Sequence, residues 1–394
     1  MSRVLFLTPQ LPYPPHQGAA IRNLNLVKLA AREHEVNICS FVRDPAEVGA
    51  GAELTRWATH LDTSPAPRRG QLARLAHTVL SLQPDMQRRL HSQAFRRLVG
   101  EADIVQAEGI EMAQYLADVS GQRVLDCHNA EWLLQRRAFQ VDARSGRWPG
   151  AAYSALQWLK LRRYERWACR AADTVLAVSE EDRRALLDLD ARLSINVLPN
   201  GVDTSVFRPA SDSVPAEAML FTGTLDFRPN VDALRWLVGE VWPRIRRRVP
   251  QATLTVAGRA PGPRVLALGQ VPGVTVLANP PDIVPCFHAA SVYAVPVRSG
   301  GGTRYKLLQA MACGLGIVST TVGAEGVAVR SGDELLVADS SAAFAEAAVR
   351  LMRDAPLRQR LGARARENVA ATYDWSVLAP ALLAMYERLL AGQP

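Results

Sequence analysis

A glycine-rich segment in the second half of the sequence has the composition of a phosphate-binding loop. Three consecutive glycines, Gly300, Gly301 and Gly302, follow an apolar run and precede a predicted helix. Glycines at such a place let backbone N–H groups approach an anion closely, and the helix N-terminus adds a favourable potential. Arg304 and Lys306 would add positive charge on the first helical turn, which suits the two phosphates of a nucleoside diphosphate. A plain glycine turn before a structural helix is the alternative, because such loops alone are weakly specific.

This segment belongs to a chain in which short apolar runs alternate with longer helical patterns, which is typical of βαβ units and parallel sheets. A Pro- and Ser-rich stretch, 206–215, separates two such series and reads as a linker. We therefore expect two doubly wound domains, 1–205 and 216–372, with the ligands in a cleft that both sheets face. The expected strands are 4–7, 36–41, 103–106, 124–126, 174–178 and 196–198 in the first domain, and 219–222, 253–257, 274–277, 292–295, 317–319 and 335–337 in the second. Helices are expected over 341–372, with a break near Pro356, and over 375–390.

One histidine stands where a doubly wound sheet presents ligand groups. His128 comes directly after the expected strand 124–126, at its carboxyl end. A lone histidine is more often structural than catalytic, so its position alone does not assign it a role.

Taken together, these motifs resemble retaining glycosyltransferases of family 4, also called glycosyl transferases group 1. The subgroup with a donor loop of the pattern G-G-T-R-x-K-x-x-E-A-M-A is the most similar. The matching stretches are 126–131, 198–203, 221–234, 301–314 and 373–375. The resemblance implies an α/β GT-B fold and the transfer of a sugar from a UDP- or GDP-linked donor, with retention of configuration and without a metal ion. It also implies a last helix, 373–394, that packs back on the N-terminal domain.

The resemblance assigns roles to individual residues. It gives His128 a hydrogen bond to the donor sugar or to a group close to the reacting atoms. It places Arg304 and Lys306 near the diphosphate, where fixed positive charge would stabilise the leaving group. The other donor-binding residues that it implies are Gly18, Gly223, Thr224, Arg228, Gly300, Gly301, Gly302, Thr303 and Gln309.

The sequence departs from the family pattern at two places that bear on activity. Gln309 stands where the family usually has glutamate, so its contact with the ribose hydroxyls would be weaker than a charge-assisted one. Thr224 and Pro229 replace a basic pair, and we expect Arg228 to contribute part of the lost phosphate-facing charge. Two alternatives stay open. One is a nucleotide-sugar epimerase of the same fold, and the other is a non-catalytic partner subunit with the GT-B fold, which the neutral Gln309 and the missing carboxylate at Gly301 suggest.

The sequence gives little support for a metal site. Asp188-Leu-Asp190 spells the D-x-D pattern of metal-dependent sugar transferases, but it ends a helical stretch, so ordinary exposed acids are expected there. The five cysteines are scattered singly, which favours reduced thiols over a disulfide framework or a zinc site.

Residues 68–97 are strongly basic, with seven arginines against one aspartate. The interspersed leucines are compatible with helices that have a basic face, either solvated or in contact with anionic lipid. Nucleic acid is not expected, because no recognised reader motif is present. No run approaches the ~20 apolar residues of a spanning helix. We therefore expect a cytoplasmic protein, free or peripheral at the inner face of a membrane, that acts on a glycan, polysaccharide-precursor or glycolipid acceptor.

Overall fold

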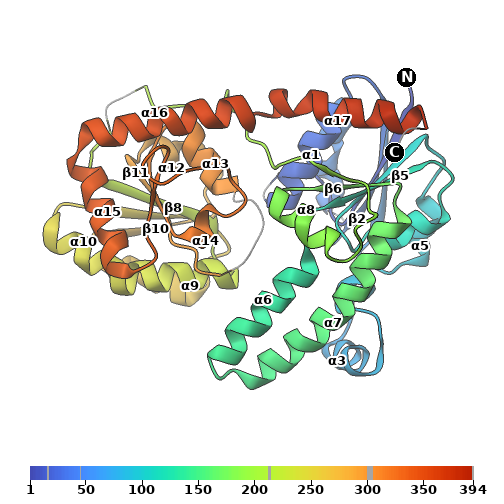
Figure 1. The fold of residues 1–394 in the computed structure, drawn as a ribbon, viewed down its shortest axis with the longest axis horizontal. Helices are drawn as coiled ribbons and strands as arrows, with labels where there is room; N and C mark the ends of the chain where they lie inside the picture. Colours follow the sequence, from blue (N-terminus) through green and yellow to red (C-terminus); the bar gives the residue numbers. More distant parts are fainter. Residues whose placement is uncertain (16, 45, 212–213, 300–304, 393–394) are drawn as a thin grey trace. The chain divides into compact units, whose positions relative to one another are not determined.

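The computed structural model describes residues 1–15, 17–44, 46–211, 214–299 and 305–392. It divides into two compact units, one formed by Met1–Pro199 with Leu378–Pro394 and the other by Asn200–Val377 (Figure 1). The division falls before the expected linker 206–215, which lies inside the second unit.

Within the described residues, the first unit contains a seven-stranded parallel sheet of order β3-β2-β1-β4-β5-β6-β7. Its strands are β1 Arg3–Thr8, β2 Glu35–Val42, β3 His60–Pro65, β4 Ile104–Glu108, β5 Gln122–Cys127, β6 Thr174–Ala177 and β7 Ile195–Val197. Six of them confirm expected strands, whereas β3 was not predicted. The strand order reverses between β1 and β4, and ligands of doubly wound sheets bind at such a switch point.

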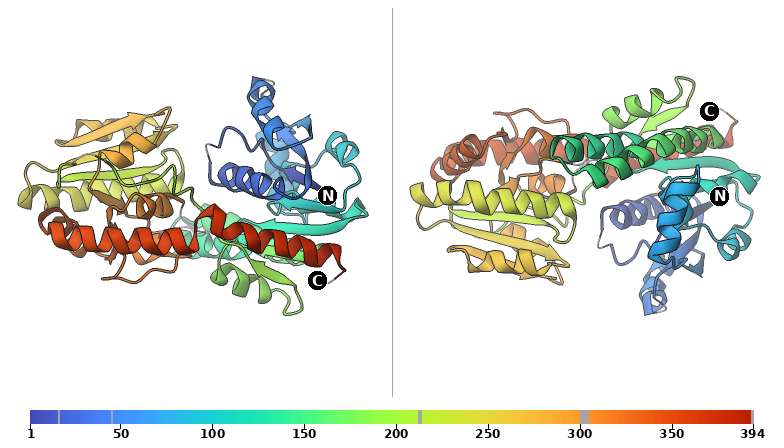
Figure 2. Two further views of the ribbon diagram at one scale, coloured as in Figure 1. Left: turned by 90° about the horizontal axis from the view of Figure 1, so that it is seen from above. Right: turned by 90° about the horizontal axis from the view of Figure 1, so that it is seen from below.

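Helices flank this sheet, and two of them extend well away from it. The helices are α1 Gly18–Ala30, α2 Ala46–Gly51, α3 Gln71–Leu80, α4 Asp85–Arg89, α5 Gln93–Leu98, α6 Glu131–Arg144, α7 Trp148–Ala171 and α8 Glu180–Leu187. Figures 1 and 2 show α6 and α7 as an antiparallel hairpin whose tip projects from the sheet. The end of α3 packs on α7, since the Lys160 ammonium donates to the Thr78 carbonyl at 2.5 Å.

The second unit, over its described ranges, contains a six-stranded parallel sheet of order β10-β9-β8-β11-β12-β13. Its strands are β8 Ala218–Thr224, β9 Thr253–Arg259, β10 Val274–Ala278, β11 Val292–Val295, β12 Gly316–Ser319 and β13 Leu336–Val337, and each confirms an expected strand. The switch point lies between β8 and β11. The helices before the C-terminal ones are α9 Arg228–Trp236, α10 Trp242–Arg248, α11 Pro263–Leu266, α12 Val284–His288, α13 Tyr305–Ala312 and α14 Thr321–Ala324.

Three consecutive helices close the chain: α15 Ser341–Arg353, α16 Ala355–Thr372 and α17 Trp375–Leu390. The expected break near Pro356 is confirmed. Asp354 accepts the Leu357 amide at 2.9 Å and so caps α16, while Pro356 occupies the first turn, where its missing N–H costs nothing. Residues of α17 from Leu378 onward belong to the first unit. Among the described helices, none is both long enough and apolar enough to cross a membrane.

Candidate active site

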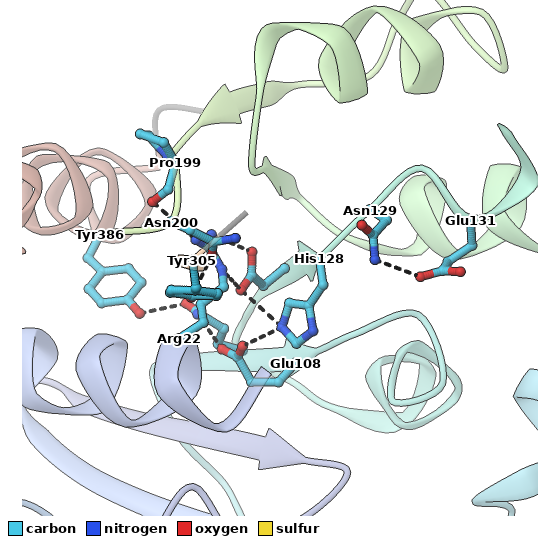
Figure 3. Close-up of polar contacts among 11 residues, drawn as sticks. Arg22, Glu108, His128, Asn129, Glu131, Pro199, Asn200, Tyr305 and Tyr386 are labelled. Atoms are coloured by element: carbon cyan, nitrogen blue, oxygen red, sulfur yellow. Dashed lines mark hydrogen bonds and ion pairs between the residues drawn. The ribbon is translucent and has the colours of Figure 1, made fainter. Parts of the chain in front are cut away.

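Four polar side chains meet at the switch point of the first unit (Figure 3). Glu108 ends β4, Asp126 lies in β5, and His128 follows β5 directly. Arg22 reaches them from α1 and binds both Asp126 oxygens, at 2.6 and 2.8 Å. The His128 Nε2 atom lies 3.2 Å from Glu108 Oε2 and 3.4 Å from Asp126 Oδ2. Glu108, Asp126 and Arg22 are buried, so this cluster holds two carboxylates and a guanidinium away from water, beside the partly exposed His128.

The electrostatics of the cluster make His128 a proton donor. Burial lowers the pKa of His128, but hydrogen bonds to Asp126 and Glu108 outweigh this effect and raise it to about 10. Burial would raise the pKa of Asp126, yet Arg22 and His128 hold it well below its usual range. Burial and the charge of Asp126 raise the pKa of Glu108 to about 7. At neutral pH the imidazole is therefore protonated, so both ring nitrogens carry hydrogen.

Of the four side chains in the cluster, that of His128 is the accessible one. The His128 side chain is 19% exposed. Its Nε2 faces Glu108 and Asp126, so the Nδ1–H group is the one left to bind an incoming oxygen. The geometry thus favours His128 as a hydrogen-bond donor over a general base.

Buried groups behind Glu108 fix its orientation. The Tyr386 hydroxyl, from α17, lies 2.5 Å from Gln106 Oε1. The Gln106 amide in turn donates to Glu108 Oε1 at 2.7 Å. Tyr386 and Gln106 are both fully buried, so this chain of hydrogen bonds holds the carboxylate that faces His128.

Two further carboxylates position the loop that carries His128. The Asp182 carboxylate accepts a hydrogen bond from the Ala130 amide at 2.9 Å. Glu165, from α7, accepts the Glu131 and Trp132 amides at 2.9 and 2.8 Å and so caps the beginning of α6. The backbone on the C-terminal side of His128 is therefore held at three consecutive amides.

A second polar site lies at the switch point of the other unit. Lys306, on the first turn of α13, donates to Asn230 Oδ1 at 2.9 Å, and its ammonium lies 5.1 Å from the centre of the Phe221 ring. Asn230 also donates to the Thr224 carbonyl at 2.8 Å. A Cβ atom added to Gly223 would lie 2.7 Å from Lys306 Nζ, so a larger residue would displace the ammonium from this position. These contacts place a cation at the carboxyl end of β8.

The remaining predicted residues are placed as follows. Gly18 is the exposed first residue of α1, Arg228 is the exposed first residue of α9, and Gln309 is half-buried on α13. Lys306, Gly223 and Thr224 come together, while His128 belongs to the other unit. The predicted donor-loop residues Gly300, Gly301, Gly302, Thr303 and Arg304 lie outside the described residues.

The residue types at the first cluster could in principle hold a cation. Among the described residues, ligand atoms of Glu108, Asp126 and His128 all lie within 4.8 Å of one another. Arg22 already binds both oxygens of Asp126, and the pKa of His128 favours its protonated form, which cannot ligate a metal. The cluster therefore fits a proton-sharing network better than a metal site. Of the D-x-D residues, Asp188 is exposed as expected, whereas Asp190 is buried and pairs with Arg170 at 2.5 Å and with Arg192 at 3.2 Å.

Comparison with known proteins relates both units to one group of enzymes. Residues 17–206 match the family model described as Glycosyltransferase Family 4, and residues 216–354 match the one described as Glycosyl transferases group 1. The first matched region thus corresponds to a family 4 domain, and the second to a group 1 domain. The His128 cluster lies in the family 4 domain, and the Lys306 site lies in the group 1 domain.

Solved structures share the complete fold of these glycosyltransferase domains. Sucrose-phosphate synthase from Thermosynechococcus elongatus superimposes with a TM-score of 0.73 at 19% identity, covering 100% of both chains. Anabaena HepE, solved in complex with UDP-glucose, gives a TM-score of 0.66 at 16% identity and covers 98% of this chain and 100% of HepE. These matches confirm the expected GT-B fold with two Rossmann-like domains.

Curated relatives of these glycosyltransferase domains match over shorter stretches. The D-inositol 3-phosphate glycosyltransferase of Mycobacterium tuberculosis is 30% identical over 247 residues, which is 56% of this chain and 49% of the relative. An uncharacterized 44.6 kDa protein in the cps region of Klebsiella pneumoniae is 23% identical over 164 residues, or 42% of its length. The chain thus spans about half the length of the curated relatives that it matches.

Sequence reasoning missed the partners that define both sites. Arg22 lies inside a helix, Glu108 comes two residues after the predicted end of its strand, and Asn230 follows a proline near the beginning of α9. In the sequence alone, none of these residues differs from an ordinary surface residue, because only the fold buries it. Polar residues at the carboxyl ends of strands next to the switch point were the available signal, and they would have indicated Glu108.

The stability of the first unit should depend on pH through His128. Its pKa of about 10 lies above the unfolded value near 6.5, so the folded state binds the extra proton between these limits. The stabilisation is complete below the unfolded pKa and is lost as the pH rises through 10. We expect the free energy of unfolding to fall by roughly 3 kcal/mol more in the wild type than in His128→Asn between pH 7 and 10. Urea unfolding of both proteins measures this difference, and parallel pH curves would contradict it.

Proposed function

We propose that the protein transfers a sugar from a nucleoside diphosphate sugar, with a UDP-linked donor as the first choice. The observation that carries this proposal is the Lys306 ammonium, held by Asn230 beside Gly223 at the switch point of the group 1 domain. A cation beside a glycine near the end of a strand suits a diphosphate. The phosphates can approach the glycine backbone closely, while the ammonium offsets their charge. The UDP-glucose complex of the structurally similar HepE supports the choice of UDP.

The proposed reaction divides its chemical tasks between the two sites. Lys306, with Arg228 and the predicted Arg304 and glycine amides, would stabilise the negative charge that develops on the departing diphosphate. His128 would donate its Nδ1–H group to an oxygen of the donor sugar, while Glu108 and Asp126 hold the imidazolium in place. The acceptor oxygen would attack the anomeric carbon on the face from which the diphosphate leaves, so its configuration is retained. The acceptor proton would pass to the leaving phosphate oxygen.

The proposed chemistry needs no metal ion, because Lys306 and the arginines provide the positive charge that a divalent cation provides in other transferases. We therefore expect a chelator to leave turnover unchanged. Strong inhibition by the chelator, reversed by one divalent cation, would contradict this part of the proposal.

Donor binding can be tested by thermal unfolding with metal chelated. A nucleotide that binds the folded state stabilises it by about 2.7 kcal/mol at a hundredfold excess over its dissociation constant. We expect UDP to raise the Tm more than GDP, ADP, TDP or CMP, and GDP to be second. A flat response to every nucleotide would favour the non-catalytic partner subunit instead.

We further propose that the acceptor is a glycan, a polysaccharide precursor or a glycolipid presented at an anionic membrane surface. At the end of α3, the apolar side chains of Val79, Leu80 and Leu82 are 66%, 84% and 78% exposed. Exposed arginines at positions 68, 88 and 97 lie in the same basic segment. Exposed apolar side chains combined with basic ones are typical of surfaces that insert shallowly into anionic bilayers.

Replacing Leu80 with glutamate should weaken membrane contact. We expect the fraction of protein that sediments with phosphatidylglycerol vesicles to fall about fivefold. The substitution removes apolar area that would be buried in the bilayer, and it adds a negative charge that the anionic lipid repels. The matched control is Leu266→Glu, in which an apolar residue of the other unit with 47% exposure is changed. Equal sedimentation of wild type and Leu80→Glu, or equal binding to neutral phosphatidylcholine vesicles, would count against the membrane contact.

A further inference from the structure

The first unit contains a pocket that the two sites above do not use. It has a volume of about 410 Å³ and lies between the segment that holds α3 and α4 and the α6–α7 hairpin, which Figure 1 shows next to each other. Its polar lining includes Arg69, Asp85, Arg89, Glu131, Tyr153 and Gln157. The volume suits a ring the size of a monosaccharide.

The charges that line this pocket are balanced. Arg69 binds Asp85 at 3.0 Å, and Arg89 binds Glu111 at 2.5 Å. A phosphate would have to compete with these carboxylates for either guanidinium. The lining therefore favours a neutral ligand over an anionic one.

Gln157 contributes a buried amide group to the lining of the pocket. Its side chain is 3% exposed, and its Oε1 accepts the Asp85 amide at 3.1 Å, which fixes the orientation of the amide group. Its Nε2 is buried and makes no hydrogen bond to any residue that the structure describes. Buried donors in native proteins are nearly always satisfied, and a ligand hydroxyl would satisfy this one.

Glu131 connects the pocket to His128. It is the first residue of α6, three residues after His128 in the chain, and Asn129 donates to its Oε1 at 3.1 Å (Figure 3). Burial and the charge of Glu111 raise the pKa of Glu131 to about 7. Near neutral pH this carboxyl can accept from one hydroxyl and donate to another, as sugar recognition requires.

We propose that this pocket binds a neutral, hydroxyl-rich sugar ring of the acceptor, with Gln157, Tyr153 and Glu131 as its hydrogen-bond partners. That the bound sugar belongs to the acceptor rests on the proposed function. Loss of one hydrogen bond to the ring should weaken binding by about fivefold.

Saturation-transfer NMR with the methyl glycosides of glucose, galactose and mannose tests the pocket directly, with inorganic phosphate as the anionic comparison. We expect at least one glycoside to bind the wild type, and its dissociation constant to rise about fivefold in Gln157→Leu. Tyr153→Phe changes an exposed residue and should therefore fold. It should weaken glycoside binding by a similar factor, and it replaces Gln157→Leu as the test if that variant fails to fold. Gln251→Leu, at an exposed glutamine of the other unit, is the matched control.

Thermal shifts with UDP on the same samples separate the two proposals. If UDP stabilises all variants while no glycoside binds, or while glycosides bind the pocket variants as tightly as the wild type, the pocket proposal is wrong and the proposed function stands. If glycoside binding depends on Gln157 and Tyr153 but UDP has no effect, the proposed function fails and the pocket remains a sugar site. Phosphate that displaces the glycoside from the wild type would overturn the assignment of a neutral ligand.

Discussion

The His128→Ala variant is expected to transfer sugar about a thousandfold more slowly than the wild type, with little change in its affinity for UDP. The wild-type imidazolium offers its Nδ1–H group from a fixed orientation, because Nε2 faces Glu108 and Asp126 at 3.2 and 3.4 Å. Alanine removes that donor. It also leaves two buried carboxylates with one fewer cation, and Glu108 then becomes protonated more readily.

Steady-state kinetics of His128→Ala should show the loss in kcat, while thermal unfolding with UDP reports whether the donor still binds. The matched control is His60→Ala, which changes an exposed histidine at the beginning of β3. Because Tyr386 and Gln106 hold Glu108 from behind, Tyr386→Phe should lower kcat in the same direction but far less. A His128→Ala enzyme with wild-type kcat would remove His128 from the mechanism.

The Lys306→Met variant is expected to bind UDP about thirtyfold more weakly than the wild type, and to lose a similar factor in kcat. Methionine is one atom shorter than lysine and uncharged, so an apolar contact with Phe221 can persist while the phosphate loses its cation. Gly223→Ala should act in the same direction without changing any charge, because its Cβ atom would lie 2.7 Å from Lys306 Nζ.

Isothermal titration with UDP measures this loss. Lys28→Met is the matched control, since Lys28 also lies over an aromatic ring, 4.6 Å from the centre of Trp57, but in the other unit. Undiminished UDP affinity in Lys306→Met would show that the diphosphate binds elsewhere. Weaker binding in Lys28→Met as well would indicate a general loss of stability instead.

Most strands were predictable because their sequences are continuously apolar, which is typical of strands in parallel sheets. The exception is β3, which lies at the edge of its sheet and pairs with β2 alone. Its residues, His60–Pro65, are largely exposed, so no apolar run distinguishes them from a loop. An edge strand of this kind depends on its neighbour for its conformation, and a local sequence pattern cannot reveal it.

The sites were predictable only in part, for a related reason. His128 and Lys306 stand at strand and helix ends that the alternating pattern locates, so their positions follow from the sequence. The groups around them do not, because Arg22 lies 104 residues from the Asp126 that it binds, and Asn230 lies 76 residues from Lys306. Only the strand order of each sheet brings these side chains together, and local periodicity does not determine that order.

The measurement that tests the central claim most directly is product analysis by mass spectrometry, with metal chelated. The protein is incubated with UDP- and GDP-sugars, with and without a mixture of glycan and glycolipid acceptors. We expect a nucleoside diphosphate and a glycosylated acceptor to form together, and both to decrease strongly in His128→Ala and Lys306→Met. An isomerised sugar nucleotide formed without acceptor would identify an epimerase, and an unchanged donor in the presence of demonstrated UDP binding would identify a non-catalytic subunit. Either result would contradict the assignment as a glycosyltransferase.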